Sequence, residues 1–270
     1  VVINFYKSEK KAKKLSDEFG ENVLIVQADI SQNKDIKNMM IEINEYFNDY
    51  PSILINNALA EYVFNGDLRT HAEDISWKEI SNQLDVTLKG SIEVLQALIP
   101  SMKKRKFGRV INIGTNLTLN PVVPYHDYII AKSALLGMTR SFAKDLGPSN
   151  ITVNMVSGGL LKVTDASAGT PEEVFESIAT MTPLQKVTTV KDFADAVTFF
   201  ALDDARAITG QNLVVDGGLT FNWFKHIILM MDNEVAKLSK VFELTPEELI
   251  QKAIDSGEGV IAKNGALSVE

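Results

Sequence analysis

Cysteine is absent from the 270 residues of this chain, which excludes disulfide bonds and thiolate metal sites. Histidine occurs three times without the spacing of metal ligands, so no metal site is expected. No apolar run approaches the roughly 20 residues that a membrane-spanning helix needs, and the N-terminus lacks the layout of a signal peptide. These absences favour a cytoplasmic protein that has no membrane partner.

Positive charge is also scarce. The 27 Lys and Arg residues are outnumbered by 35 Asp and Glu residues, so the net charge is −8. This balance argues against nucleic acid as a partner. Hydrophobic residues, at 45% of the chain, are numerous enough to build a sizeable core.

Short apolar segments alternate with helical patterns over the first 220 residues. Because the expected strands are almost uniformly apolar, they indicate a parallel sheet that helices cover on both faces. The alternation therefore predicts a doubly wound, Rossmann-like α/β fold. The expected strands are 1–5, 23–28, 53–55, 109–113, 151–156 and 212–215, and the expected helices are 8–19, 31–47, 76–103, 125–146 and 190–202.

Two features inside these helices are predicted from single residues. Ser31 is expected to cap the helix at 31–47, because a serine side chain can accept from the first free N–H groups of a helix. The helix at 76–103 is expected to be interrupted near Pro100, because proline removes a backbone donor.

The composition changes after about Leu219, which divides the chain into a domain at 1–220 and an appended tail at 221–270. The tail does not continue the alternation of strands and helices. It contains the start signal of a short helix from Thr245 to about Asp255, and residues 260–269 are expected to form an extended ribbon.

Tyr128 and Lys132 are four positions apart, so on a helix their side chains lie on one face. A free tyrosine has a pKa of about 10, and an adjacent ammonium group lowers that pKa by stabilising the phenolate. Such a pair can move a proton to or from an alcohol oxygen. The same spacing is common on ordinary surface helices, so the neighbouring residues must decide between the two interpretations.

Polar residues follow several of the predicted strands, at the edge where doubly wound folds bind ligands. Thr115 offers a hydroxyl for a substrate carbonyl, although it is also an ordinary strand-end residue. Asn56 and Asn57 can meet a ligand or tie loops together. Asp29 can accept from a nucleotide base or simply lead into the next helix.

Five motifs follow one another along the chain: Asn-Asn-Ala at 56–58, Gly-Arg-Val-Ile-Asn-Ile at 108–113, Tyr-x-x-x-Lys at 128–132, Ile-Thr-Val-Asn at 151–154 and Thr-Gly-Gln-Asn-Leu-Val-Val-Asp-Gly-Gly at 209–218. In this order and spacing they resemble the short-chain dehydrogenase/reductase family, and residues 1–220 most resemble its 3-oxoacyl-ACP reductase-like branch. The resemblance implies hydride transfer from a nicotinamide cofactor to a carbonyl carbon. It also implies that Tyr128 donates the proton and that Lys132 lowers the Tyr128 pKa and holds the ribose.

The resemblance assigns further positions, some of them with departures from the family pattern. Thr115 stands where the family has the Ser that binds the carbonyl, and Thr87 stands where it has the Asn that anchors a relay water. Gly-Gly replaces the usual Pro-Gly after the fifth predicted strand, which predicts a more mobile loop. The cofactor is expected to contact Lys7, Asp29, Ile30, Asn56, Asn57, Ala58, Tyr128, Lys132, Gly158 and Gly159.

The choice of cofactor has a clue at the end of the first predicted strand. NAD-selective relatives commonly carry an acid there, whereas this chain has Lys7 nearby and no acid. A lysine can pair with the 2′-phosphate, so NADP(H) is expected rather than NAD(H).

The resemblance also implies a glycine-rich turn, with its strand and helix, about 30 residues before Val1. That turn brings the pyrophosphate to a helix N-terminus, and its strand lies in the centre of the sheet. We therefore suspect a fragment and expect the chain as written to be compromised in folding or in cofactor binding.

The tail is separately similar to the N-terminal stretch of ATP-dependent phosphoenolpyruvate carboxykinases, at 247–249 and 257–270. The similarity stops before any phosphate loop, so a fused or misassembled reading frame without kinase-type chemistry is suspected. The alternative is a coincidental amphipathic tail that packs on the core.

The predicted function is the NADP(H)-dependent reduction of a 3-oxoacyl-like or related ketone, free or linked to an acyl carrier or CoA. Apolar residues in the expected substrate walls, such as Phe64, Leu160 and Leu161, are compatible with a fatty substrate. The alternative is a catalytically impaired fragment, or a non-catalytic binding or oligomer subunit of the same family. A homo-oligomer, by resemblance a tetramer, is expected to form through the helices at 76–103 and 125–146 and the last strand.

Overall fold

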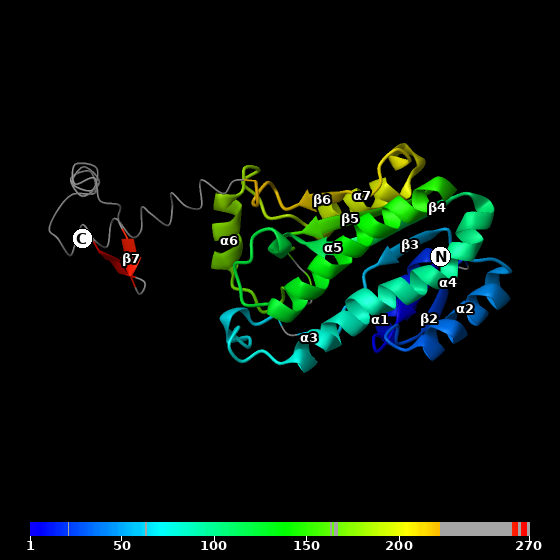
Figure 1. Cartoon of the computed structure of the whole chain (residues 1–270), viewed down its shortest axis with the longest axis horizontal. Helices are drawn as coiled ribbons and strands as arrows, with labels where there is room; N and C mark the ends of the chain where they lie inside the picture. The colour runs from blue at the N-terminus through cyan, green and yellow to red at the C-terminus, as the bar shows by residue number, and fades with distance from the viewer. Residues whose placement is uncertain are drawn as a thin grey trace.

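The computed structural model describes residues 1–221 apart from 21, 63, 163, 165 and 166, together with residues 261–263 and 266–268. Strands and helices alternate along residues 1–221, as the sequence predicts (Figure 1). The strands are β1 (Val2–Phe5), β2 (Leu24–Gln27), β3 (Ile53–Asn56), β4 (Gly108–Thr115), β5 (Ile151–Gly158) and β6 (Asn212–Val215). The helices are α1 (Glu9–Phe19), α2 (Asn33–Phe47), α3 (Trp77–Leu84), α4 (Ser91–Arg105), α5 (His126–Leu146), α6 (Glu172–Met181) and α7 (Val190–Ala201).

The strands β1–β6 pair in parallel throughout, which confirms the predicted Rossmann-like α/β fold. They do not form one sheet, however. β1 pairs with β2, and β3, β4, β5 and β6 follow one another in a second sheet. Within the described residues, β1 and β3 each have one strand neighbour only. Ile53 and Ile55 on β3 are consequently 42% and 47% exposed.

Helices cover both faces of the larger sheet. α2, α4 and α5 contribute to one continuous core, in which Ile36, Leu95 and Leu135 are almost fully buried. α7 packs on the opposite face through Val197 and Phe200. Because β4 and β5 lie between these layers, β5 is buried along its whole length and β4 at all but one position.

The unit formed by β1 and β2 is attached to the rest of the domain through helix packing and polar contacts. α2 packs against α4, and Lys89 donates to the carbonyl of Ser31 at 3.0 Å. Arg105, at the end of α4, donates to the carbonyl of Tyr50 at 2.7 Å. The start of α4 comes so close to this unit that a Cβ on Gly90 would lie 2.9 Å from the carbonyl oxygen of Ile30.

The long helix is not interrupted at Pro100, so that prediction was wrong. Pro100 lies inside α4, where the buried side chains of Leu95, Leu98 and Met102 hold the helix on the core. The irregularity lies upstream, in a π-helical turn (η2, Asp85–Gly90) between α3 and α4.

Ser31 does not cap α2, which corrects a second prediction. The helix begins after Gln32, and no side-chain cap is formed there. Instead, Asp35 Oδ2 accepts from the N–H of Asp29 at 3.1 Å, which fixes the turn that leads into the helix.

Two short strands lie in the tail. β7 (Ile261–Lys263) and β8 (Ala266–Ser268) pair antiparallel, as expected for the predicted ribbon at 260–269. The helix predicted from Thr245 to Asp255 lies outside the described residues.

Candidate active site

Tyr128 and Lys132 lie one turn apart in the N-terminal part of α5, which packs on β4 and β5. Lys132 is 3% exposed, and its Nζ donates to the carbonyl of Ile113 at 2.7 Å. The same Nζ lies 5.7 Å from the centre of the Tyr128 ring. Burial lowers the pKa of Lys132 to about 8. The structure thus brings the predicted pair together.

The phenol of Tyr128 lies beside Thr115, the last residue of β4. Burial raises the pKa of Tyr128, and a hydrogen bond with Thr115 lowers it by less. The sequence predicted a lowered pKa because of Lys132. In the structure desolvation outweighs the favourable contacts, so Tyr128 is neutral and can act as a proton donor near neutrality.

Thr87 lies in the π-helical turn η2 and is 1% exposed. Its Oγ1 has no hydrogen-bond partner in the part of the chain that the structure describes. A buried hydroxyl without a partner costs about 1–3 kcal/mol, and π-helical turns are frequent at functional sites. The Thr87 hydroxyl therefore has hydrogen-bonding capacity that the described residues do not use.

The two asparagines at the end of β3 have different roles. Asn56 is buried and donates to Asn112 Oδ1 at 2.8 Å, and Asn112 in turn donates to Thr139 at 2.8 Å. The Asn56 side chain thus ties β3, β4 and α5 together. Asn57 and Ala58 are exposed at the carboxyl edge of the sheet.

Asp29 and Ile30 both serve the structure of the turn after β2. Asp29 Oδ1 accepts from the N–H of Ser31 at 2.9 Å, and Ile30 is buried against Gly90. Asp29 thus stabilises the turn that leads into α2.

Lys7 follows β1 and is exposed. It forms an ion pair with Glu61 at 2.7 Å, which raises the pKa of Lys7 and lowers that of Glu61. Glu61 was not predicted at this place. It lies 54 residues away in the sequence, so no local pattern could reveal it.

Gly158 and Gly159, at the end of β5, allow close packing. A Cβ on Gly158 would lie 3.0 Å from the Phe193 ring, and one on Gly159 would lie 3.1 Å from Asp216 Cβ. Close packing alone therefore explains why glycine stands at both positions, without the loop mobility that the sequence predicted.

The residues present fit one half of a nicotinamide dinucleotide. Beside Tyr128 lies the ammonium group of Lys132. Asn57, directly after β3, is exposed, and Thr87, in η2, has a hydroxyl without a partner among the described residues. A doubly wound fold holds the pyrophosphate at the point where the strand order reverses. At that point, between β1 and β3, the described residues contain neither a strand nor a glycine-rich turn.

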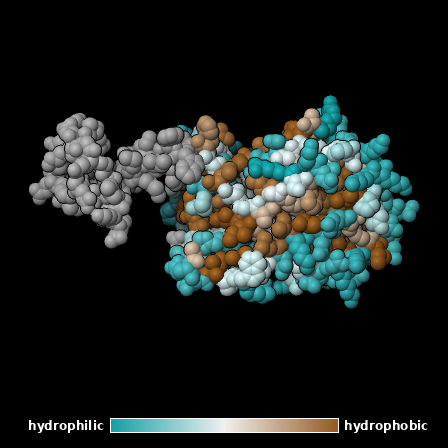
Figure 2. Space-filling model, in the orientation of Figure 1, coloured by the Kyte–Doolittle hydropathy of each residue, from teal (hydrophilic) through white to brown (hydrophobic). Residues whose placement is uncertain are grey.

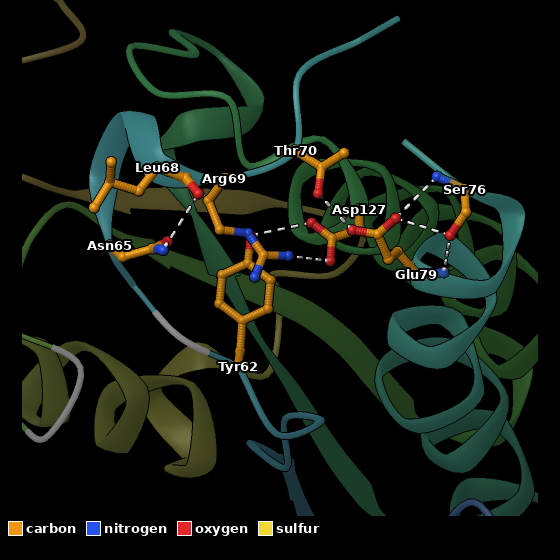
Figure 3. Close-up of polar contacts among 8 residues, drawn as sticks. All are labelled: Tyr62, Asn65, Leu68, Arg69, Thr70, Ser76, Glu79 and Asp127. Atoms are coloured by element: carbon orange, nitrogen blue, oxygen red, sulfur yellow. Dashed lines mark hydrogen bonds and ion pairs between the residues drawn. The ribbon is translucent and has the colours of Figure 1, made fainter. Parts of the chain in front are cut away.

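An aromatic and charged cluster lies beside Tyr128; the sequence predicted Phe64 in a substrate wall, but not the contacts of Tyr62, Arg69 and Asp127. Tyr62 and Phe64, in the loop after β3, place their ring centroids 5.5 and 5.6 Å from that of Tyr128. The buried carboxylate of Asp127 accepts from the Tyr62 hydroxyl at 3.0 Å and from Arg69 at 2.9 Å (Figure 3). Arg69 and Asp127 are 58 residues apart in the sequence. The only local signal was an acid in the first turn of a helix, which indicates a helix start and nothing more.

Two further kinds of feature are absent from the described part of the chain. No group of three or more His, Asp or Glu side chains there is placed to hold a metal ion. Likewise, none of the described helices combines the length and the apolar character that crossing a bilayer requires.

Comparisons with known proteins identify relatives over most of the chain. The family described as Enoyl-(Acyl carrier protein) reductase matches residues 1–220. The 3-oxoacyl-(acyl-carrier-protein) reductase FabG of Haemophilus influenzae is 32% identical over 218 residues, which cover 81% of this chain and 87% of the relative. The protein of the same name from Staphylococcus aureus is 28% identical over 222 residues, with 81% and 87% covered.

A solved structure shares the fold. The crystal structure of a candidate gluconate dehydrogenase from Agrobacterium tumefaciens superposes with a TM-score of 0.71 at 20% sequence identity. The superposition covers 81% of this chain and 85% of that protein. At this identity the likeness supports the α/β fold alone.

Proposed function

Because the chain belongs to the short-chain dehydrogenase/reductase family, we propose that it is an NADP(H)-dependent oxidoreductase that reduces a 3-oxoacyl-like or related ketone to an alcohol. The observation that carries the proposal is the partly buried Tyr128 phenol, which is bonded to Thr115 and flanked by the ammonium group of Lys132. The names of the relatives, which are 3-oxoacyl-(acyl-carrier-protein) reductases, support a substrate linked to an acyl carrier or to CoA.

Each of the three side chains has a distinct part in the proposed reaction. A bound nicotinamide supplies the hydride to the carbonyl carbon. Tyr128 donates its proton to the oxygen, because its raised pKa keeps the phenol protonated until charge develops there. Thr115 donates a hydrogen bond to the same oxygen and so fixes the carbonyl. Lys132, which is mostly charged below pH 8, stabilises the phenolate that remains.

Thr87 is proposed to take part in returning a proton to Tyr128. Its hydroxyl is buried and lacks a partner among the described residues, so it can hydrogen-bond a member of a proton relay. A threonine reaches less far than an asparagine, which makes this the weakest support in the catalytic group.

Preference for NADP(H) is supported by Lys7. Its ammonium group is exposed and pairs with Glu61 on the surface, so a doubly charged 2′-phosphate can displace that carboxylate. The remaining proposed cofactor contacts lie along the carboxyl edge of the strands. They are Asp29, Ile30, Asn56, Asn57, Ala58, Gly158 and Gly159, together with Tyr128 and Lys132.

We further propose a cytoplasmic homo-oligomer built on residues 1–220, with residues 221–270 as an appendage. Figure 2 shows a band of apolar residues across the face that α3, α4 and α5 present. Ile130, on α5, is 42% exposed although it is apolar. Such a band on a domain surface supports an interface between subunits.

A non-catalytic subunit of the same family is the second candidate. The observation that favours it is the division of the sheet between β1 and β3, because the pyrophosphate would lie there.

Steady-state assays separate these candidates. The chain is given acetoacetyl-CoA, crotonyl-CoA or ethyl acetoacetate with millimolar NADPH or NADH, and nicotinamide absorbance is followed. We expect oxidation with the two keto compounds, more rapid with NADPH. Oxidation with crotonyl-CoA alone would assign an enoyl reductase, and no oxidation with any compound would favour the non-catalytic subunit.

A further inference from the structure

The loop after β3 is fastened at both sides to the starts of helices. Arg69 pairs with Asp127 of α5, and the N–H of Gly66 donates to the Tyr125 hydroxyl at 2.8 Å. Thr70 donates to Glu79 at 2.8 Å, and Figure 3 shows this contact beside the Asp127 pair. A loop of this kind is ordinarily among the more mobile parts of a protein, so these bonds indicate that its position matters.

The pair between Arg69 and Asp127 is buried. Their side chains are 18% and 4% exposed, so solvent screens their attraction little. The Arg69 guanidinium also lies 4.2 Å from the centre of the Tyr62 ring, and Asp127 accepts from the Tyr62 hydroxyl. Tyr62 is therefore clamped between the two charged groups. Loss of either partner would leave the other charge buried and uncompensated.

The clamped ring is one wall of an aromatic enclosure around Tyr128. The ring centroids of Tyr62 and Tyr128 are 5.5 Å apart, and the two ring planes are inclined at 33°. The ring centroids of Phe64 and Tyr128 are 5.6 Å apart, with the planes inclined at 81°. The ring centroid of Tyr125 lies 5.7 Å from those of Tyr62 and Phe64. Rings at these separations are in van der Waals contact, so this side of Tyr128 has no space for a branch on the substrate.

Resting on the proposed function, we propose that Tyr62 and Phe64 are specificity-determining residues, that the pair of Arg69 and Asp127 positions them, and that the site therefore prefers ketones that are unbranched beside the carbonyl. Asp127 directly precedes Tyr128, so the pair ties the wall to the same helix turn that carries the proton donor. Arg69 and Asp127 act through Tyr62 and are positioning residues.

The wall is tested with Phe64→Ala and with ethyl acetoacetate and ethyl 2,2-dimethylacetoacetate at millimolar NADPH. We expect the ratio of kcat/KM for the branched ester over the unbranched ester to rise about tenfold or more, which is the usual effect of a few methylene groups in a pocket. Leu68→Ala is the matched control, because Leu68 lies in the same loop and is 85% exposed. That control should leave the ratio unchanged. An unchanged ratio in Phe64→Ala would overturn the proposal.

The positioning role is tested with Arg69→Met and Arg69→Lys. Arg69→Met should raise the same ratio, and it should accelerate hydrogen exchange at the amide of Gly66 without substrate or cofactor. Arg69→Lys keeps the charge, so it should bring the kcat/KM ratio and the exchange rate of the Gly66 amide most of the way back to the wild-type values. Slow exchange and a wild-type ratio in Arg69→Met would contradict the role.

Failure of the proposed function would be recognised separately. In that case the wild-type chain oxidises NADPH with neither ester. The steric role of Tyr62 and Phe64 is then tested by calorimetric titration of the wild type and of Phe64→Ala with each of the two esters. The variant should gain affinity for the branched ester only.

Discussion

The Thr115 hydroxyl is bonded to the Tyr128 phenol, and in the proposed reaction it donates to the carbonyl oxygen. Thr115→Ala removes the hydroxyl that is bonded to Tyr128 and that is proposed, with substrate bound, to donate to the developing oxyanion. We expect kcat to fall by about 10²-fold or more, whereas Thr115→Ser should remain within a few fold of the wild type. Steady-state kinetics of the two variants would contradict this role if alanine and serine gave equal rates.

Lys132 carries a stability cost that its function explains. Its pKa of about 8 in the folded chain lies below the ordinary value of 10.5, so keeping it charged costs roughly 3 kcal/mol at pH 7. The folded protein releases this proton before the unfolded chain does, so the cost falls as the pH rises from about 8 to 10.5.

Lys132→Met should therefore be inactive but more stable than the wild type at pH 7. The gain is about 1–2 kcal/mol, because loss of the hydrogen bond to Ile113 offsets part of it. Above pH 10 the order should reverse, since the neutral lysine keeps that bond. Urea unfolding at both pH values measures the difference, and a variant that is less stable at pH 7 would contradict the account.

Among the elements, the junction of η2 and α4 is tightly constrained. A Cβ on Gly90 would lie 2.9 Å from the backbone oxygen of Ile30, which cannot move without the turn after β2. Gly90→Ala should thus destabilise the protein by about 1–3 kcal/mol. Gly137→Ala on α5 is the matched control, because nothing lies within 4 Å of its Cβ position. That change should stabilise by about 0.5–1 kcal/mol. Thermal unfolding of both variants measures the two stability changes. Equal changes in Gly90→Ala and Gly137→Ala would contradict the steric argument.

The strands and helices were largely predictable because their patterns are local. An apolar run such as β5 indicates burial on both faces, and that burial is observed. The behaviour at Pro100 was not predictable, because the packing of Leu95, Leu98 and Met102 on the core outweighs a local helix breaker. The start of α2 was not predictable either, because a hydrogen bond from the N–H of Asp29 to Asp35 takes the place of the expected cap by Ser31.

The candidate site was predictable only where its residues lie close in sequence or at strand ends. Tyr128 and Lys132 share one helix face, and Thr115 ends a strand, so their meeting follows from the fold. The pairs of Arg69 with Asp127 and of Lys7 with Glu61 join distant segments. Their formation depends on loop conformation, which no residue pattern specifies.

For the whole molecule, the division of the sheet between β1 and β3 is the feature with the largest consequence. The edges of both strands face a position where the described residues provide no partner, and Ile53 and Ile55 remain partly exposed. Residues 1–270 should therefore bind NADPH more weakly than about 10 µM, several kcal/mol short of a nanomolar site. Calorimetric titration measures this affinity, and a dissociation constant of about 1 µM or lower would show that the divided sheet does not impair the cofactor site.

The central claim is that Tyr128 is the proton donor of a carbonyl reductase, and turnover of Tyr128→Phe tests it most directly. The change keeps the ring and its packing against Tyr62 and Phe64 while it removes the acidic proton. With acetoacetyl-CoA and millimolar NADPH, we expect kcat to fall by about 10²–10⁴-fold. A kcat within a few fold of the wild-type value would contradict the claim.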